Sequence, residues 1–296
     1  MGSGFARSTE NKKAALGRLN RIGGAEGDRT LDLRIANATL SQLSYRPKTK
    51  VGCESYKLQP ALARSRIRKI MSHIAIVLPV LNEEAQIVGC LRALQPLREQ
   101  SCELIVADGG SRDRTLAWAE PLADRLVSGP RGRAAQMNAG ARQAGGEILW
   151  FLHADSLPPP DAASLIRAAL ADPGQHWGRF DVRLSGRQPL LRVVETLMNR
   201  RSRLTGIATG DQGIFVRRAL FEQIGGYPSI ALMEDIALCR RLKPHGRPVC
   251  LRQRLQTSSR RWERDGISRT ILLMWRLRLA YFLGADPARL ARIYYR

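Results

Sequence analysis

Cysteine is scarce in this chain, and its distribution excludes two kinds of structural site. The five cysteines are widely spaced and none belongs to a C-x-x-C pair, so the sequence indicates neither a zinc site nor a disulfide framework. Their odd number and scattered positions predict a reducing, cytoplasmic setting. The first residues contain no apolar stretch that resembles a signal peptide.

Long uncharged apolar runs are also missing. The nearest approach to a membrane span is the segment 271–283, which Arg276 and Arg278 interrupt. We expect this segment to pack on the domain. The alternative is peripheral contact of this C-terminal helix with the inner face of a membrane, with the arginines at the lipid head groups.

Acidic residues are few compared with basic ones, 26 against 48, which gives a formal net charge of +22. Such an excess favours anionic partners, namely nucleic acid, nucleotide phosphates or an acidic membrane surface. Aromatic residues make up 6% of the chain, and the basic residues are not gathered on one element with aromatics between them. We therefore expect no nucleic-acid partner. A basic nucleic-acid- or membrane-binding protein is the alternative that is not an enzyme, and a generally arginine-rich composition explains the charge equally well.

Residues 1–70 differ from the rest of the chain. They contain polar and basic clusters with little periodicity, which predicts a disordered basic arm or residues translated upstream of the natural start. From Met71 onward, strand and helix patterns alternate. We expect one domain over 71–296, with a nucleotide-binding half at 71–160 and an acceptor-binding half at 161–296 that ends in a basic C-terminal helix.

The alternation after Met71, with apolar strands in repeated βα units, predicts an α/β fold with a mostly parallel sheet and helices on both faces. Strands are expected at 74–79, 104–107, 125–127, 148–152, 179–184 and 213–217, and helices at 83–94, 112–122, 133–144, 161–170, 190–204, 218–224 and 234–242.

Lone carboxylates follow two of these strands. Asp155 lies between the strand 148–152 and a proline-rich turn, so it is expected to be exposed at the carboxyl edge of the sheet, where ligands bind. Asp108 follows the strand 104–107 and precedes two glycines that would let a ligand approach the backbone.

Phosphate-binding loops of the Walker and G-x-G-x-x-G types are absent, so a metal is the natural way to hold phosphates. Mg²⁺ or Mn²⁺ on a diphosphate needs one or two carboxylates, and Asp155 could supply one. His153, two residues earlier, would point the same way if the strand extends that far. The alternative is that Asp155 caps the following turn.

Further acidic and amide side chains flank the expected helices. Asn82 and Glu83 follow the first strand, which ends at Pro79, and they either border a nucleotide or cap the next helix. Glu234 and Asp235 begin the helix 234–242. Asp235 is either a general base or, with Glu234, a complement to the helix dipole.

These segments, taken in order, resemble the family 2 glycosyltransferases with the GT-A fold over about residues 71–242. The motifs are Leu-Pro-Val-Leu-Asn-Glu-Glu at 78–84, Asp-Gly-Gly-Ser-Arg-Asp-Arg-Thr at 108–115, His-Ala-Asp at 153–155, Gly-Asp-Gln-Gly at 210–213 and Glu-Asp at 234–235. Arg-x-x-Gln-Met-Asn at 133–138 and Ser-Ser-Arg-Arg-Trp at 258–262 resemble a bacterial subgroup named for its genomic association with radical-SAM, selenodomain or arsenosugar proteins.

The resemblance implies a nucleotide-diphosphate sugar donor, with UDP the expected nucleotide, a divalent metal, and direct transfer of the sugar with inversion. Asp155 would hold the metal, with His153 in place of a first carboxylate. Asp235, beside Glu234, would deprotonate an acceptor hydroxyl or carboxyl group. The residues implied to bind the nucleotide sugar are Pro79, Asn82, Glu83, Asp108, Arg133 and Asp155, together with Arg260 and Arg261, which would steady the departing diphosphate from a basic C-terminal loop or are ordinary solvated arginines.

One departure from the family pattern limits the reaction. Ser258 stands where processive synthases have the glutamine of Gln-x-x-Arg-Trp, and membrane-spanning segments are missing, so we expect transfer of a single sugar. A nucleotidyltransferase is the alternative enzyme, and a lipid or carotenoid acceptor at the membrane surface is the alternative substrate, which the C-terminal helix would suit. The sequence fixes neither the sugar, the acceptor nor the oligomeric state.

Overall fold

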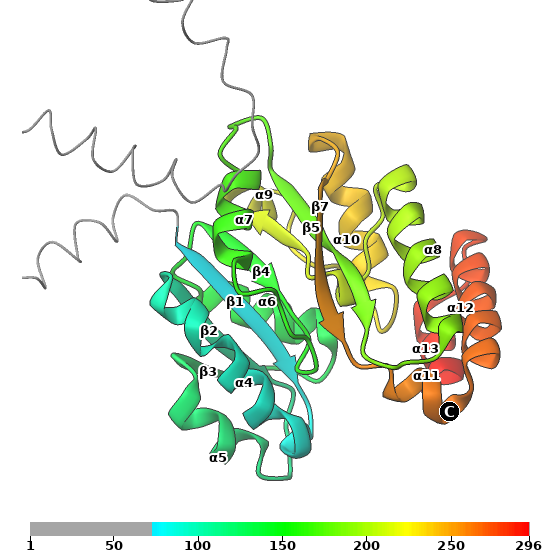
Figure 1. Cartoon of the computed structure of the whole chain (residues 1–296), viewed down its shortest axis with the longest axis horizontal. Helices are drawn as coiled ribbons and strands as arrows, with labels where there is room; N and C mark the ends of the chain where they lie inside the picture. Colours follow the sequence, from blue (N-terminus) through cyan, green and yellow to red (C-terminus); the bar gives the residue numbers. More distant parts are fainter. Residues whose placement is uncertain (1–72, 296) are drawn as a thin grey trace, which may run out of the picture. The chain divides into compact units, whose positions relative to one another are not determined.

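The computed structural model describes residues 73–295. The basic arm expected at 1–70 and the domain start at Met71 lie outside the described residues. The centre of the described part is a seven-stranded sheet in the order β3-β2-β1-β4-β6-β5-β7 (Figure 1). The strands are β1 (Ile74–Val80), β2 (Cys102–Asp108), β3 (Arg125–Ser128), β4 (Ile148–Phe151), β5 (Trp177–Leu184), β6 (Phe215–Arg217) and β7 (Val249–Thr257).

The sheet is mostly parallel. Strands β1 to β4 pair in parallel, and so do β5 and β7, whereas β6 runs antiparallel to both of its neighbours, β4 and β5. Every strand except β6 therefore ends at one edge of the sheet, and β6 begins there. The expected α/β sheet is confirmed.

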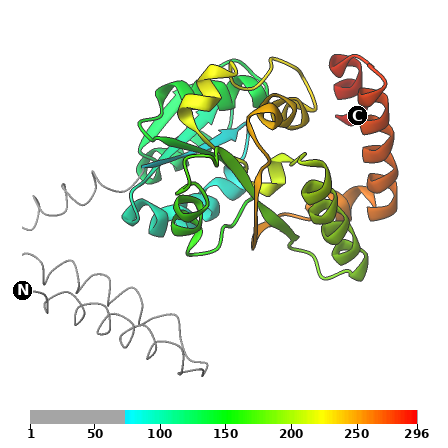
Figure 2. The same ribbon diagram turned by 90° about the horizontal axis from the view of Figure 1, so that it is seen from above.

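Helices cover both faces, as Figure 2 shows. They are α4 (Glu84–Glu99), α5 (Thr115–Ala119), α6 (Arg133–Gln143), α7 (Ala162–Ala169), α8 (Pro189–Thr205), α9 (Arg218–Gln223), α10 (Glu234–Leu242), α11 (Arg260–Asp265), α12 (Ile267–Phe282) and α13 (Pro287–Tyr294). Short 3₁₀ turns lie at Glu120–Leu122, Gly210–Gln212 and Lys243–His245.

Strand β1 shows how the two layers are packed, because its successive side chains point to opposite faces. Ile76 and Leu78 belong to the core under α4 and α7, and Val77 belongs to the core under α6, α9 and α10. Gly140 lets α6 approach β1 closely, since a Cβ at this position would lie 2.5 Å from Cγ1 of Val77. A larger residue there would push the helix away from the sheet.

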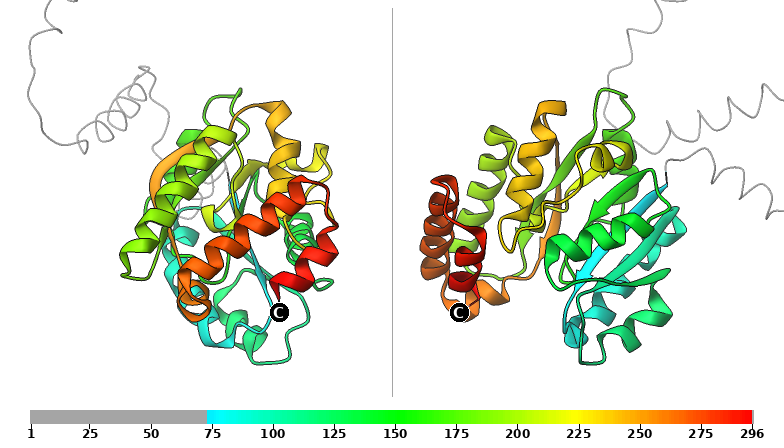
Figure 3. Two further views of the ribbon diagram at one scale, coloured as in Figure 1. Left: turned by 90° about the vertical axis from the view of Figure 1, so that its right-hand side faces the viewer. Right: turned by 180° about the vertical axis from the view of Figure 1, so that it is seen from behind.

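The C-terminal helices extend the second half of the domain. Leu277 of α12 and Leu290 of α13 pack against Met233 and Ile236 at the start of α10. Ile267, at the start of α12, packs with α8. Figure 3 shows α8, α12 and α13 together at the end of the domain remote from β3.

Two expected helices differ from the structure, and one strand was not expected. Helix α4 continues past Pro96 to Glu99, because the carbonyl of Arg92 that loses its donor lies on an exposed turn while Leu94 and Leu97 remain buried. The helix expected at 112–122 is shorter, and a 3₁₀ turn containing Pro121 completes it. The basic C-terminal region was not predicted to contain a strand, yet it supplies the edge strand β7.

Within residues 73–295, the length and apolarity that crossing a bilayer requires do not occur together in any helix.

Candidate active site

Five segments that carry the sequence motifs meet at one edge of the sheet. The loops after β1, β2, β4 and β7 leave from the carboxyl ends of parallel strands, and the loop that enters β6 arrives at the same edge because β6 is reversed. In order along the chain, the five segments are residues 81–84, 109–115, 152–156, 209–213 and 258–261. Asn82, Asp108, Asp155 and Arg260 are therefore brought together, as the sequence predicts.

The loops after β1 and β2 are joined by hydrogen bonds. The N–H of Asn82 donates to Oγ of Ser111 at 3.0 Å, and the Asn82 side-chain oxygen accepts from the N–H of Arg112 at 2.9 Å. The N–H of Glu83 donates to Oγ1 of Thr115 at 2.8 Å. Asn82 adopts a left-handed conformation with φ of 53°. Its side chain therefore joins two loops and does not cap α4, which was the alternative interpretation.

Asp108 is buried, and its carboxylate holds the turn that follows β2. It accepts from the N–H of Gly110 at 2.9 Å and from the N–H and hydroxyl of Ser111, the latter at 2.5 Å. Pro79 lies one residue before the end of β1 and pairs in register with Ala107. Asp108 and Pro79 therefore lie at the ends of β2 and β1, beneath the place where a nucleoside is expected.

Two carboxylates, those of Asp155 and Glu83, lie within electrostatic reach of each other beside these loops. Asp155 is half-buried, not exposed as expected, and accepts a hydrogen bond from Oγ1 of Thr257 at 3.3 Å. Burial and the negative charge of Asp155 raise the pKa of Glu83, while the charge of Arg260 opposes this. A pair of like charges in partial burial attracts a cation, so this is the part of the edge best suited to a metal.

His153 faces the loop that enters β6. Strand β4 ends at Phe151, so His153 and Asp155 lie in the turn beyond it. Nδ1 of His153 is 3.4 Å from Oδ1 of Asp211, and its Nε2 packs against Gly210, where a Cβ would lie 2.5 Å away. Burial alone would lower the pKa of His153, but the hydrogen bond and charge of Asp211 outweigh it and raise that pKa.

Asp235 is tied to the same loop from the opposite side. Its Oδ2 accepts from the N–H of Gly210 at 3.1 Å, and its Oδ1 accepts from the N–H of Ile236 at 2.7 Å. Burial, followed by the neighbouring charge of Glu234, raises the pKa of Asp235 from 3.8 to about 6. The turn Gly210–Gln212 therefore connects His153 on the β4 side with Asp235 on the α10 side.

The predicted basic residues divide into two groups. Arg260 is exposed at the start of α11, where its Nε donates to Oγ of Ser258 at 3.2 Å, and its charge reaches Glu83. Arg133, at the start of α6, lies within electrostatic reach of Glu234 and Asp211. Both can meet an anion at the edge.

Arg261, by contrast, holds the C-terminal helix in place. Its guanidinium stacks on the ring of Tyr294 at 3.6 Å, and its Nη2 donates to the Tyr294 carbonyl at 2.6 Å. Arg260 and Arg261 thus lie in helix α11 and not in a loop, which corrects the expected loop.

Three residues at this edge were not predicted to be site residues, namely Asp211, Thr257 and Tyr294. Asp211 stands in the quoted Gly-Asp-Gln-Gly motif, but its pairing with His153 depends on the reversal of β6. Thr257 ends the strand that was not predicted. Tyr294 lies in α13 and is separated from Arg261 along the chain by the whole of α12. No local sequence pattern therefore signals the contact between the two residues.

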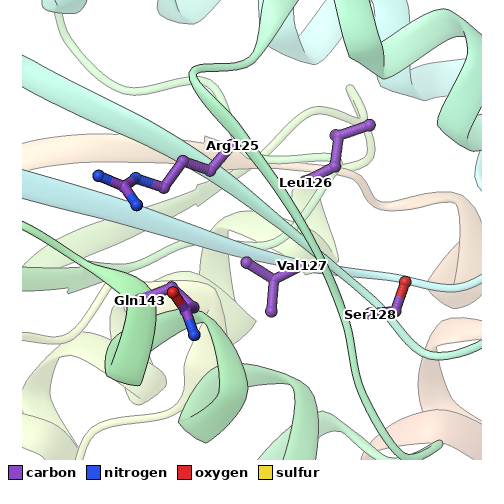
Figure 4. Close-up of a pocket in the computed structure, with 5 residues that line it drawn as sticks. All are labelled: Arg125, Leu126, Val127, Ser128 and Gln143. Carbon is purple, nitrogen blue, oxygen red and sulfur yellow. The ribbon is translucent and has the colours of Figure 1, made fainter.

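A pocket elsewhere in the domain does not involve these residues. It is lined by Arg125, Leu126, Val127 and Ser128 of the edge strand β3 and by Gln143 of α6 (Figure 4). No predicted site residue lines it.

The residues at this edge offer a divalent metal few protein ligands. Among residues 73–295 there is no group of three or more His, Cys, Asp or Glu side chains suited to a metal ion. Mg²⁺ bound to a diphosphate needs one or two protein carboxylates, however, and the neighbouring Asp155 and Glu83 meet this requirement. His153 fits less well, because its two ring nitrogens already face Asp211 and Gly210.

Comparison with known proteins identifies the family. The profile described as glycosyl transferase family 2 matches residues 75–225, which is about half of the chain and includes the first four motif segments. The chain belongs to glycosyl transferase family 2.

Curated relatives match this family 2 chain over part of their length. A probable glycosyltransferase of Bacillus subtilis is 25% identical over 240 residues, which cover 73% of the chain and 56% of the relative. The undecaprenyl-phosphate 4-deoxy-4-formamido-L-arabinose transferase of Pseudomonas aeruginosa is 28% identical over 169 residues, covering 49% of the chain and 46% of the relative. The chain thus spans about half the length of these relatives.

Solved structures of glycosyltransferases share the fold. A mannosyltransferase of Pyrobaculum calidifontis, in complex with GDP-Man and Mn²⁺, aligns with a TM-score of 0.52 and 24% identity over 77% of the chain and 69% of its own. TarS of S. aureus aligns with a TM-score of 0.52 and 18% identity over 63% and 60%. The family 2 chain therefore has the GT-A fold.

Proposed function

We propose that the protein is an inverting glycosyltransferase that moves one sugar from a nucleotide-diphosphate sugar to a hydroxyl or carboxyl group of an acceptor. The observation that carries the proposal is the turn Gly210–Gln212, which contacts His153 on one side and Asp235 on the other at the carboxyl edge. On one side lie Asp155 and Glu83, suited to a metal–diphosphate, and on the other lies Asp235, suited to proton transfer.

In this proposal Asp235 is the general base. Its pKa of about 6 leaves it mostly ionised at neutral pH, yet basic enough to accept a proton. The acceptor oxygen loses its proton to Asp235 and forms a bond to the anomeric carbon of the sugar. The bond from that carbon to the diphosphate breaks at the same time, and the diphosphate leaves with the electron pair. Attack from the face opposite the leaving group inverts the configuration.

The donor would lie over the joined loops after β1 and β2. Pro79, Asn82 and Asp108 would surround the nucleoside, because they form the floor of the edge. Arg260 and Arg133 would meet the diphosphate at the N-terminal ends of α11 and α6.

We assign Arg261 a supporting role, since its guanidinium is engaged with α13. UDP is the proposed nucleotide. One structural relative was solved with UDP-GlcNAc and another with GDP-Man, so the guanosine donor is the alternative.

A divalent metal, Mg²⁺ or Mn²⁺, fits this arrangement. Asp155 would hold it, with Glu83 nearby, and when bound it would neutralise charge on the leaving diphosphate. His153 would hold the Gly210–Gln212 turn in position through its contact with Asp211. The sequence predicts a different role for His153, that of a direct metal ligand. The Pyrobaculum relative carries Mn²⁺.

The organisation of the chain extends the proposal. The half at 71–160 would bind most of the donor, and the half at 161–296 would bind the acceptor. The enzyme would be cytoplasmic. It would belong to the bacterial subgroup that the motifs at 133–138 and 258–262 resemble. A lipid or carotenoid acceptor is the favoured refinement, because α12 exposes large apolar side chains. A nucleotidyltransferase is disfavoured, since no basic phosphate-binding loop follows β1.

The proposal is tested by thermal unfolding of the full chain with a panel of nucleoside diphosphates and nucleotide sugars, with and without Mn²⁺. Metal-dependent stabilisation by one nucleotide, lost in Asp155→Ala, is the expected result. Thr257→Val is the matched control, because it removes the hydrogen bond to Asp155 but leaves the carboxylate. A folded protein that no nucleotide stabilises would contradict the proposal.

A further inference from the structure

Two helices expose large apolar side chains at alternating spacings of three and four residues. On α8 these are Leu190, Val193, Leu197 and Leu204, and on α12 they are Leu272, Trp275, Leu279 and Phe282. Their exposed fractions run from 39% at Leu190 to 78% at Leu204, and all four on α12 are at least 60% exposed. This spacing places each set in one stripe along its helix. We call the two stripes together the apolar face.

The two stripes lie at the same end of the domain. The buried sides of the helices pack together, since Leu191 and Val194 of α8 share a small core with Ile267 of α12. The exposed stripes therefore both point away from that core, and Figure 3 (left) shows α8 and α12 on the side turned toward the viewer. Exposed apolar area of this extent marks a binding surface rather than ordinary solvent-facing structure.

The charge of these helices indicates what the apolar face binds. Together α8 and α12 carry seven arginines and one acidic residue, Glu195. Glu195 is buried and accepts from the N–H of Leu184, so it does not offset the surface charge. Arg200, Arg269 and Arg276 are exposed beside the apolar stripes. The surface thus combines apolar side chains with positive charge alone.

We propose that the apolar face docks the protein on an anionic lipid bilayer. Helices α8 and α12 lie in the plane of the membrane surface, their apolar side chains reach the acyl chains, and their arginines meet the lipid phosphates. Trp275 suits the boundary between head groups and acyl chains. A second copy of the chain fits less well, because it would bring the same positive charges together.

Docking through this face is connected with the candidate active site but does not rest on the proposed function. Helix α11, which carries Arg260, leads through Gly266 directly into α12. Arg261 of α11 holds Tyr294 of α13. The membrane contact therefore belongs to the same group of C-terminal helices that borders the edge where the acceptor is expected.

The test is flotation of the purified full-length protein with vesicles of phosphatidylcholine alone and of phosphatidylcholine with phosphatidylglycerol. We expect binding to the anionic vesicles. Leu197→Glu on α8 and Leu279→Glu on α12 should each lower the partition coefficient at least about tenfold, because each removes several apolar carbons from the contact. Trp118→Glu is the matched control, since Trp118 is 44% exposed on α5, outside the apolar face, and should leave binding unchanged.

Three outcomes would overturn the proposal. The first is no binding to anionic vesicles, and the second is equal loss in the Trp118 variant, which would indicate a charge effect without a defined face. The third is that the protein forms a dimer in sedimentation equilibrium and that Leu197→Glu or Leu279→Glu dissociates this dimer. That result would show that the apolar face binds a second copy of the chain. Circular dichroism checks that each variant is folded, and nucleotide binding measured separately distinguishes failure here from failure of the proposed function.

Discussion

Replacing Asp235 by asparagine should change the pH dependence of stability in a defined direction. The pKa of Asp235 is raised from 3.8 to about 6 in the folded protein by burial and by Glu234. The folded state therefore binds the Asp235 proton more tightly than the unfolded state does. The stability that this proton contributes is present at low pH and is lost as the pH rises through about 6.

The size of the effect follows from the shift. One pKa unit corresponds to about 1.4 kcal/mol, so ionising Asp235 costs the folded state about 2 kcal/mol between pH 4.5 and pH 8. Asparagine does not ionise in this range. It also offers one acceptor oxygen where Gly210 and Ile236 both donate, which adds a cost that does not depend on pH. The difference in free energy of unfolding, wild type minus Asp235→Asn, should therefore fall by about 2 kcal/mol as the pH rises.

Urea unfolding of both proteins at several pH values measures this difference. Initial rates on the same samples test the chemical role, because asparagine cannot accept the acceptor's proton and the rate should fall roughly 10²-fold or more. In the wild type, log(kcat/KM) should decline as the pH drops below about 6. A stability difference that is flat with pH, or that rises with it, would refute the assignment of a raised pKa to Asp235.

Four further substitutions, one of them with a matched control, probe the site and the core. Arg260→Ala should raise the KM for the donor with little change in melting temperature, whereas Arg261→Ala should destabilise the fold by about 1–2 kcal/mol through its lost stacking and hydrogen bond, as calorimetry would show. His153→Ala should weaken Mn²⁺-dependent nucleotide binding by less than the roughly 10–100-fold that is typical when an outer-shell partner of a metal ligand is removed. Titration calorimetry measures this binding. Gly140→Ala should lower the free energy of unfolding by about 1–3 kcal/mol, because the added methyl group overpacks the contact with β1. Its control, Gly89→Ala, has open space around it and should leave that free energy unchanged or raise it by up to about 1 kcal/mol. Urea unfolding measures both.

Most of the sheet could be predicted from the sequence because its strands are apolar and uninterrupted. Strand β7 could not, because Arg252, Gln253 and Arg254 interrupt its apolar pattern and face solvent at the edge of the sheet. A register shift opposite Phe180 and Asp181 further disturbs the alternation. The expected helix 83–94 stops before Pro96, whereas α4 continues to Glu99 because burial on both sides of Pro96 outweighs the lost hydrogen bond.

The candidate site was predicted where a motif follows a strand directly. Asn82, Asp108 and Asp155 lie at the expected edge because the carboxyl ends of parallel strands must meet there. The position of Asp211 depends on the direction of β6, which no local pattern encodes. The same applies to Tyr294, whose contact with Arg261 arises from the packing of α12 and α13.

The reversed strand β6 also bears on how such a protein can change over evolution. Strands β4 and β6 pair Ile148 with Arg217 and Trp150 with Phe215. This pairing holds the two ends of the segment 152–214 together, whatever the length of that segment. Insertions between residues 157 and 208, away from Asp155 and from the Gly210–Gln212 turn, would leave the Asp155 and Asp235 sides in the same relation, because the cost of closing a longer loop grows slowly with its length. A lineage could therefore acquire new acceptors by lengthening the part of the chain between these two turns, while the transfer chemistry is inherited unchanged.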